Sequence, residues 1–388
     1  MTVNKINVSK LMPVMMIYII MGFADIIGVA TAYVQKDFEL TDSLAQLLPS
    51  MALIWFFLLS VPTGVLLDKH GKKKLVSIGV VTIASGMLLP FVYYSFYSMM
   101  LSIALMGVGN TIIQVSTNPL LLDVVPSKKF SSFMSFSQFI KAISSLLGPV
   151  IAAFAASAFG DWKYVFLVYG ITSILSVLWL NFTKIEETKP KELPATFGSC
   201  FGLLGNKFIL FMTLGIFFVV GADVGMNTNI TTYLHSLFNL SVEDASLGIS
   251  LYFTALMIGR FLGAILLNYV ESSRFLILST LFAMLGIALM MFTSDLLIAR
   301  VAIFIIGLSS ANLFPLIFSI ALEKMPDRAN EISGLMVMAI SGGAFIPPVI
   351  GVLSTNFGIR TSLVVLIACM VYILFAGFYS LMQTKKAA

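Results

Sequence analysis

Five ionisable residues lie inside long apolar runs of this chain: Asp25, Lys141, Asp223, Arg260 and Arg300. A charged side chain in such a run costs about 2.5–3.5 kcal/mol on membrane-insertion scales, so each one is a functional candidate. A carboxyl group whose surroundings alternate between apolar and cationic gains and loses a proton. Asp25 and Asp223 are therefore candidates for ion coupling. The alternative is that each acid forms a permanent structural pair with Lys141 or Arg260.

Amide side chains recur at helical spacing near these charges. Asn110, Gln114 and Asn118 follow one another at intervals of four, and Gln138 precedes Lys141 by three. Amides both donate and accept hydrogen bonds, so such a face suits a hydroxyl-rich ligand. The alternative is hydrogen bonding between neighbouring helices. The candidate binding residues are Asn110, Gln114, Asn118, Gln138, Lys141, Asn227, Asn229 and Asn312.

The elements that position these residues are predicted to be membrane spans. Hydrophobic residues make up 59% of the 388, and charged residues only 11%, against about 25% in an ordinary soluble domain. The apolar runs are continuous and about 20 residues long, which favours helices over β-barrel strands in a bilayer. Twelve spans are predicted, at 11–34, 43–67, 74–95, 98–123, 131–158, 163–182, 207–236, 245–269, 274–293, 296–322, 330–355 and 360–382.

Basic residues orient the predicted spans. Of the 23 Lys and Arg residues, only Lys36, Lys163 and Arg360 fall in loops of one side; three lie inside spans, and the rest gather on the other side. This bias places both termini in the cytoplasm. We expect a multi-pass protein of a bacterial inner membrane whose first span is retained rather than cleaved. The net charge of +5 then reflects orientation and not binding of nucleic acid.

The two halves of the chain repeat one another. Gly22-Phe23-Ala24-Asp25 matches Val220-Gly221-Ala222-Asp223, and Phe159-Gly160 matches Phe357-Gly358, both at an offset of 198. Six spans in each half give the halves the same orientation across the membrane. We therefore predict two pseudo-symmetric six-helix bundles, 1–182 and 207–388. A Lys-, Glu- and Pro-containing cytoplasmic linker, 183–206, joins them, and its segment TFGSCFGLL could form a short interfacial helix.

The loop after the second span resembles the major facilitator signature G-x-L-x-D-R-x-G-R-[RK], with Lys in place of Arg. It reads GVLLDKHGKKK over residues 64–74. Asp68 can cap a neighbouring helix or pair with a base across a cytoplasmic gate, and Gly71 permits a sharp turn. The alternative is a basic loop that only fixes orientation. The residues assigned to gating are Gly64, Asp68, Gly71, Lys72 and, in the eighth span, Arg260.

Within that superfamily the chain resembles the fucose–galactose–glucose proton symporters. The resemblance is carried by ADI (24–26), NP (118–119), SQF (137–139), IGRFLG (258–263), FPLIFS (314–319) and ISGG (340–343). In that family the first-span aspartate couples the proton, which implies this role for Asp25. The family also has a glutamate where this chain has Gln114, which cannot titrate. Lys141 stands where a neutral polar residue is expected. These departures suggest another substrate, another coupling ion, or both.

The resemblance and the residues together predict a secondary transporter with the major facilitator fold. It would take up a monosaccharide or sugar derivative with a proton, by alternating access, as a monomer in the lipid bilayer. Alternatives are sodium coupling through Asp25 or Asp223, and an acidic sugar or other organic anion held by Lys141. Another is a drug exporter, against which the amide faces argue, or a signalling receptor that retains the fold. Cys200 and Cys369 have no metal or redox spacing. We expect neither enzymatic activity nor a cofactor or metal.

Overall fold

The structure is a computed structural model that describes residues 6–45, 47–188 and 195–387. These residues form helices and no strand. Twelve helical segments among them are long and apolar enough to cross a membrane, which confirms the all-α class and the predicted number of spans. Lys5, Lys189 and Lys191, which the orientation argument placed on the basic side, lie outside the described residues.

The helices of the first half are α1 (Val8–Phe23), α2 (Ile27–Asp37), α3 (Asp42–Ala45), α4 (Leu47–His70), α5 (Lys72–Val92), α6 (Phe96–Val124), α7 (Phe130–Phe159), α8 (Tyr164–Phe182) and, in the linker, α9 (Phe197–Gly202). Those of the second half are α10 (Lys207–Phe238), α11 (Val242–Leu266), α12 (Ser272–Phe292), α13 (Leu296–Ser310), α14 (Leu313–Lys324), α15 (Ala329–Met338), α16 (Gly342–Phe357), α17 (Ile359–Ser362) and α18 (Val364–Ala387). Helix α9 matches the short helix predicted in the linker. Several spans run past their predicted ends, the first from Val8 to Asp37 instead of 11–34.

Local sequence explains where several spans begin and end. Ser95 and Ser98 exchange hydrogen bonds between side chain and backbone, a capping box that starts α6. The Asp295 carboxylate accepts from the backbone N–H of Ile298 and caps α13. Such caps satisfy N–H groups that have no partner within the helix. Gly160 and Gly358 follow α7 and α16 with φ of 72° and 83°, a conformation that favours glycine.

Three spans are interrupted in the middle. A 3-10 turn, η1 (Ala24–Ile26), separates α1 from α2, and another, η5 (Ala339–Ser341), separates α15 from α16. Residues 311–312 break the span formed by α13 and α14. A 3-10 stretch inside a helix often marks a hinge. Asp25 lies in η1 whereas Asp223 lies in unbroken α10, so the two acids occupy different kinds of backbone.

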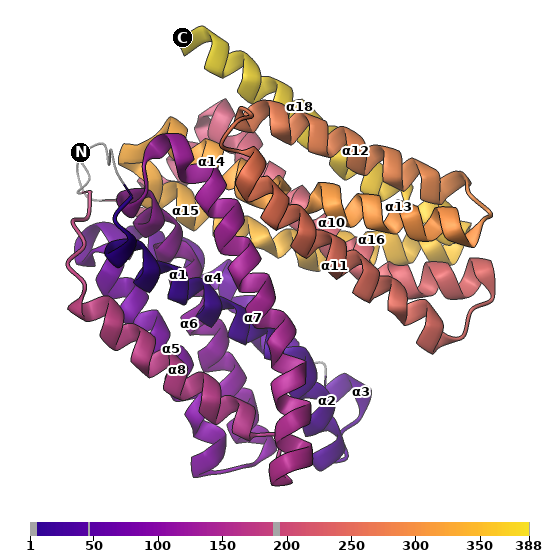
Figure 1. Cartoon of the computed structure of the whole chain (residues 1–388), viewed down its shortest axis with the longest axis horizontal. Coiled ribbons are helices and arrows are strands. Elements are labelled where there is room, and N and C mark those ends of the chain that lie inside the picture. Colours follow the sequence, from indigo (N-terminus) through magenta and orange to yellow (C-terminus); the bar gives the residue numbers. More distant parts are fainter. Residues whose placement is uncertain (1–5, 46, 189–194, 388) are drawn as a thin grey trace. The chain divides into compact units, whose positions relative to one another are not determined.

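Two compact units divide the chain. Unit 1 comprises Met1–Phe130, Ser137–Gly202 and Met325–Met338, and unit 2 comprises Ser131–Phe136, Leu203–Lys324 and Ala339–Ala388. In unit 1, α5 packs against α6 and α8, and Figure 1 shows these three helices side by side. In unit 2, α12 packs against α13 and α18, and α10 packs against α16 and α18.

Each unit takes one short segment from the opposite half of the sequence. Residues 131–136, at the start of α7, group with unit 2, and residues 325–338, which include α15, group with unit 1. We call these two stretches the crossing segments. Helix α15 packs against α4, α6 and α9 within unit 1. The division into units therefore follows packing at these two places and not the order of the sequence.

The internal repeat extends to backbone detail. Glu39 and Asn239, which lie 200 residues apart, are the non-glycine residues with positive φ in the described part of the chain, at 50° and 52°. Gly107 and Gly307 lie 200 residues apart as well. A Cβ on either would lie 2.6 Å from a backbone oxygen, that of Ala52 for Gly107 and that of Tyr252 for Gly307. The same close approach of two helices is thus built once in each half.

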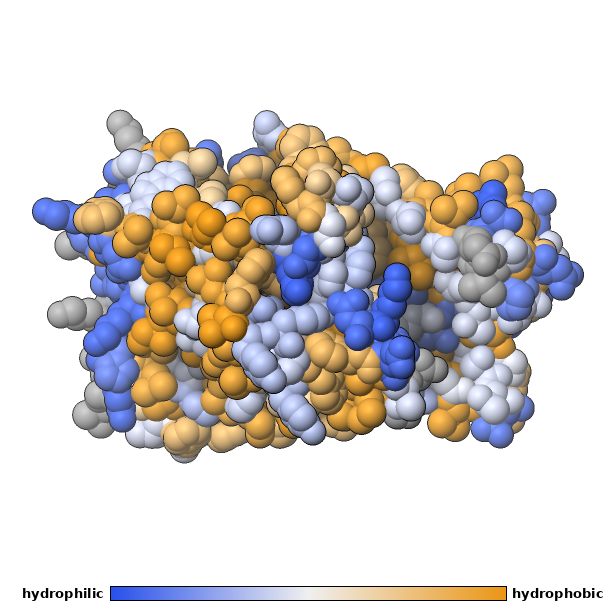
Figure 2. Space-filling model, turned by 90° about the horizontal axis from the view of Figure 1, so that it is seen from below, coloured by the Kyte–Doolittle hydropathy of each residue, from blue (hydrophilic) through white to orange (hydrophobic). Residues whose placement is uncertain are grey.

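The outer surface is apolar over large areas. Figure 2 shows hydrophobic residues over much of the face drawn, with hydrophilic residues in smaller groups. Leu53 and Phe57 of α4 are more than half exposed, as are Leu175 of α8 and Phe282 of α12. Such exposure is costly in water and is expected where lipid chains cover the helices.

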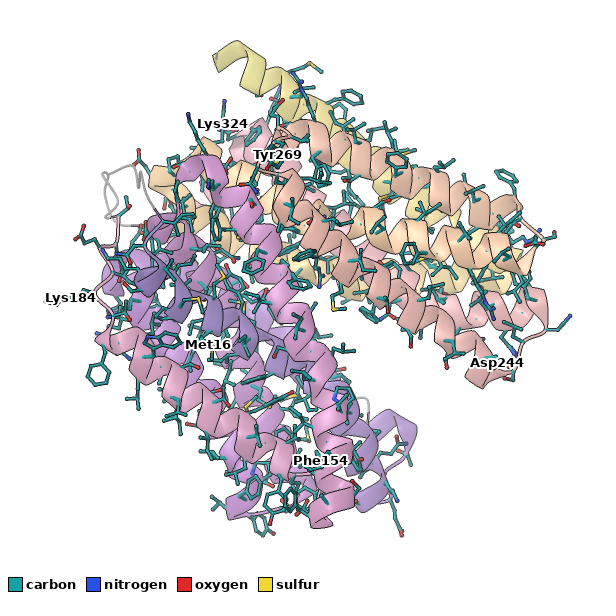
Figure 3. The ribbon with its side chains drawn as sticks, viewed as in Figure 1. Met16, Phe154, Lys184, Asp244, Tyr269 and Lys324 are labelled. Atoms are coloured by element: carbon teal, nitrogen blue, oxygen red, sulfur yellow. The ribbon has the colours of Figure 1, made fainter. Side chains whose placement is uncertain are left out.

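The two ends of unit 2 carry the loops that the predicted topology assigns to opposite sides. Tyr269, after α11, and Lys324, at the end of α14, lie near one end of the unit (Figure 3). Asp244, near the start of α11, lies at the other end (Figure 3). The alternation of span directions within this unit therefore agrees with the predicted order.

Candidate functional site

Asp25 lies on the interrupted part of the first span and contacts α7. Its side chain is exposed, and its Oδ2 accepts a hydrogen bond from the Ser145 hydroxyl. The two helices touch because Gly22 has no side chain: a Cβ there would lie 2.6 Å from the backbone oxygen of Lys141. Ser144 strengthens this contact by donating to the backbone oxygen of Ile19 at 2.7 Å. The sequence thus folds the acid of α1–α2 against a polar face of α7.

Lys141 lies one helical turn before Ser145 on α7. The Ser145 hydroxyl is 3.0 Å from the backbone oxygen of Lys141. The Lys141 side chain is partly buried, and its ammonium forms no ion pair with Asp25 or with any other carboxylate that the structure describes. The structure therefore does not show the permanent Asp25–Lys141 pair that was the alternative interpretation of these residues.

The amide face of α6 is buried inside unit 1. Asn118 accepts a hydrogen bond from the Tyr18 hydroxyl at 2.8 Å, and Tyr18 also bonds with Ser137 of α7. This link among α1, α6 and α7 is hydrogen bonding between helices, the alternative role of such amides. Asn110 and Gln114 are buried too, and the Oδ1 of Asn110 has no hydrogen-bond partner among the described residues. Both retain capacity for a ligand.

In unit 2, Asp223 is held by a tyrosine. The Tyr252 hydroxyl donates to Asp223 Oδ1 at 2.5 Å, and the Tyr252 side chain is buried. Arg260, two turns after Tyr252 on α11, lies within electrostatic reach of that hydroxyl. Arg260 thus belongs to the surroundings of Asp223 within the membrane span. Arg300 is exposed near the start of α13.

The remaining amide candidates of unit 2 fall into two groups. Asn227 is partly buried one turn after Asp223, and Asn229 donates to the backbone oxygen of Gly225 at 2.7 Å. Asn312 is 2% exposed and donates to the backbone oxygen of Gly259 at 2.7 Å. Because Asn312 lies at the break between α13 and α14, this bond joins the broken span to α11.

The last amide candidate, Gln138 of α7, belongs to unit 1, and its side chain is buried.

Two of the predicted gating residues, Gly64 and Asp68, contact the crossing segment 325–338. Asp68 Oδ1 accepts from the Asn330 side chain at 2.5 Å, and its Oδ2 accepts from the backbone N–H of Ala195 at 3.0 Å. Its partners are an amide side chain and a backbone amide, where we expected a base or a helix end. A Cβ on Gly64 would lie 3.2 Å from the Cα of Gly334, so α4 and α15 touch through two glycines.

The turn that follows Asp68 is held by acids that sequence reasoning did not single out. Gly71 has φ of 85°. Lys72 forms an ion pair with Asp123 at 2.6 Å, with side chains 5% and 3% exposed. The backbone N–H groups of Lys72 and Lys73 donate to the Glu187 carboxylate of the linker. A carboxylate at the N-terminus of α5 is favourable because the unpaired N–H groups carry partial positive charge.

Further partners lie on the linker and on the crossing segment of unit 1. Glu331 is 3% exposed; it forms an ion pair with Arg328 and accepts from the Ser199 hydroxyl at 2.6 Å. The internal repeat could have indicated that Asp68 bonds to a crossing segment. Asn268 corresponds to Asp68, and Asn268 donates to Ser132 of the other crossing segment at 3.2 Å. The two contacts occupy corresponding places in the two units.

Comparison with known proteins decides the family. A family model described as Major Facilitator Superfamily matches residues 14–348, most of the chain. The chain belongs to the Major Facilitator Superfamily. It is therefore a multi-pass membrane protein of a transporter family, and the twelve candidate spans of its described residues form the major facilitator fold.

The relatives place the chain near sugar transporters of this superfamily. A glucose/galactose transporter of Brucella abortus biovar 1 (strain 9-941) is 26% identical over 350 residues, which covers 85% of this chain and 83% of the relative. A putative glucose/galactose transporter of Helicobacter pylori (strain J99) is 26% identical over 96% of both chains. The outward conformation of FucP superposes with a TM-score of 0.82 at 18% identity, over 96% of this chain and 99% of FucP. The resemblance to the fucose–galactose–glucose branch is confirmed.

Proposed function

We propose that this protein is a secondary active transporter that takes up a monosaccharide or sugar derivative together with a proton, by alternating access. The observation that carries the proposal is Asp25, an acid on an interrupted membrane helix that is hydrogen-bonded to Ser145 and not paired with Lys141. A carboxyl group held by a hydroxyl can accept a proton without breaking an ion pair. The glucose/galactose relatives and FucP, described as a fucose:proton symporter, support the substrate class and the coupling ion.

The proposal assigns roles to the residues of both units. Asp25 carries the proton, and Asp223 couples or binds substrate. The amides of α6, α7 and α10 and the ammonium of Lys141 contact the substrate. Gly64, Asp68, Gly71, Lys72 and Arg260 belong to gating, and Asn312 would reach the site only if its bond to Gly259 opens. We propose that the protein acts as a monomer in a bacterial inner membrane with both termini in the cytoplasm.

The experiment that tests the proposal uses proteoliposomes with an imposed proton gradient. The Asp25→Asn variant is expected to lose accumulation of radiolabelled galactose or glucose while it retains exchange of labelled for unlabelled sugar. Exchange needs no net proton movement, so it reports binding and the conformational change. Asp295→Asn is the matched control, because Asp295 caps α13 and Asn caps a helix equally well. Accumulation that persists in Asp25→Asn contradicts the assignment.

Sodium is the second candidate for the coupling ion. The Asp25 carboxylate, the Ser145 hydroxyl and the backbone oxygen of Lys141 lie together, and oxygen ligands are those that hard cations prefer. Uptake would be measured at fixed pH with sodium replaced by choline. Uptake that falls with sodium removal and ignores the pH gradient would favour sodium, and the reverse would favour the proton.

A further inference from the structure

Lys141 differs from Lys72 and Lys163, two other lysines of unit 1 that are at least partly buried. Lys72, which is 4% exposed, pairs with Asp123 at 2.6 Å. Lys163, in the loop before α8, pairs with Asp161 at 3.2 Å and lies over the ring of Tyr94 at 4.0 Å. Lys141 is partly buried in the middle of a membrane span and has no such carboxylate or ring among the described residues. Its ammonium group therefore has no carboxylate within ion-pair distance among the described residues.

The acids within the spans are engaged by hydroxyl groups. Asp25 accepts from Ser145, and Asp223 accepts from Tyr252. Asp25 stays without a bond to the Lys141 ammonium even though α1 touches the Lys141 backbone at Gly22. The hydrogen bond that Asp25 makes to α7 therefore comes from Ser145 and not from the lysine. The span thus contains the Lys141 ammonium, and a ligand can provide the anion that pairs with it.

Occlusion of a substrate makes this charge more costly. A transporter that closes around its substrate removes water from the site, and a cation without water or an anion beside it is strongly unfavourable. A carboxylate on the substrate removes that cost through a charge-assisted hydrogen bond. Gln138 lies one turn before Lys141 on the same side of α7, and its side chain is buried.

We infer that the substrate is a sugar acid, a monosaccharide that carries one carboxylate, and that Lys141 is the residue that selects it. This inference rests on the proposed function and narrows its substrate class. The inference also determines the net charge that crosses the membrane in each transport cycle. One carboxylate taken up with one proton transfers no net charge, whereas a neutral sugar taken up with one proton transfers one positive charge.

The test compares galacturonate with galactose, two ligands of the same ring that differ in the carboxylate. Binding to the purified protein would be measured by titration calorimetry for the wild type, Lys141→Gln and Lys141→Arg. We expect the wild type to prefer galacturonate, and Lys141→Gln to lose this affinity by roughly 10- to 100-fold, the worth of one charged hydrogen bond. Lys141→Arg should keep most of it. A wild type that binds only galactose overturns the inference, as does equal loss of both sugars in Lys141→Gln.

A second measurement separates this inference from the proposed function and needs no variant. Uptake of each sugar into proteoliposomes would be followed with a potassium diffusion potential set by valinomycin. Galacturonate uptake driven by the pH gradient and indifferent to the potential supports the inference. Proton-driven uptake of galactose alone, accelerated by a negative interior, overturns it and leaves the proposed function intact. Absence of any sugar uptake contradicts both.

Discussion

Lys72 and Asp123 show how a permanent charge is accommodated inside this protein. Their side chains are 5% and 3% exposed and their charged atoms are 2.6 Å apart. Removing two charges from water is costly, and the pair recovers that cost only while both partners remain. Lys72, a structural lysine, forms an ion pair with an acid. Lys141, which we propose selects the substrate, forms no ion pair with a carboxylate of the described residues.

The Lys72→Met variant is expected to be destabilised by about 3–5 kcal/mol, because Asp123 is left buried without its counter-ion. The double variant Lys72→Met with Asp123→Leu should recover most of the loss. The measurement is the melting temperature of the purified protein in detergent. Lys74→Met, at an exposed position of the same basic run, is the control. A Lys72→Met protein as stable as Lys74→Met would falsify the structural role of the pair.

Tyr252 gives a second prediction at the scale of single residues. Its hydroxyl donates to Asp223, so Tyr252→Phe removes one hydrogen bond to a charged group and keeps the ring. If Asp223 binds substrate or couples the ion, the apparent KM for uptake should rise roughly tenfold with little change in melting temperature. Tyr233→Phe is the matched control, because the Tyr233 hydroxyl donates to the backbone oxygen of Met290 and to no carboxylate among the described residues. An unchanged KM in Tyr252→Phe argues against a role for Asp223.

Among the elements, α4 and α15 approach each other closely in the predicted gating region. The contact is built from Gly64 and Gly334: a Cβ on Gly334 would lie 2.9 Å from the backbone oxygen of Ser60. Asn330 and Ser333, on the same crossing segment, bond to Asp68 and to the backbone oxygen of Val115. Two small residues therefore let polar groups of α15 reach α4 and α6 together.

The Gly64→Val variant is expected to push α4 away from α15 and to break the Asp68–Asn330 bond. Initial uptake rates should fall at least roughly tenfold if this contact must form in each cycle, about 1.4 kcal/mol on the rate-limiting state. Gly351→Val is the control, because a Cβ at Gly351 of α16 meets nothing within 4 Å. Equal uptake by the two variants would show that the glycine contact is dispensable.

Hydropathy and the repeat were sufficient to predict the number of membrane spans. Each span is a long apolar run, and the same short motifs recur in the two halves of the sequence. The break of the first span at Ala24–Ile26 was not predictable, because hydropathy does not record which backbone bonds a helix makes. The partners Asp123, Glu187 and Asn330 were missed for another reason. They lie 51, 115 and 262 residues from the groups they bind, so only packing brings them there.

On the scale of the whole molecule, Cys200 offers a native reporter of the contacts made by the linker. It lies in α9, which packs against α4 and α15, and its side chain is fully buried. Burial, with the charge of Glu331 nearby, raises the pKa of the Cys200 thiol to about 12. Because the thiolate is the reactive form, a thiol with a raised pKa stays protonated and inert at neutral pH.

Labelling of Cys200 should therefore follow movement of α15 during transport. In a Cys369→Ser background, N-ethylmaleimide is expected to react slowly at pH 7.5 in the resting protein. The reaction should become several-fold faster under turnover with substrate and a proton gradient, since exposure returns the thiol pKa toward its ordinary value. Mass spectrometry of the α9 peptide measures the rate. A rate that turnover leaves unchanged would show that α9 and α15 stay together throughout the cycle.

The crossing segments have a consequence for the order of synthesis. Unit 1 includes residues 325–338, so the surface of α4 around Gly64 and Asp68 stays uncovered until most of the second half has left the ribosome. Residues 131–136 wait in the same way for α11 and α14, which supply the partners of Ser131 and Ser132. Neither unit can finish its packing alone on the growing chain, and final assembly of both belongs to the last stage of biogenesis.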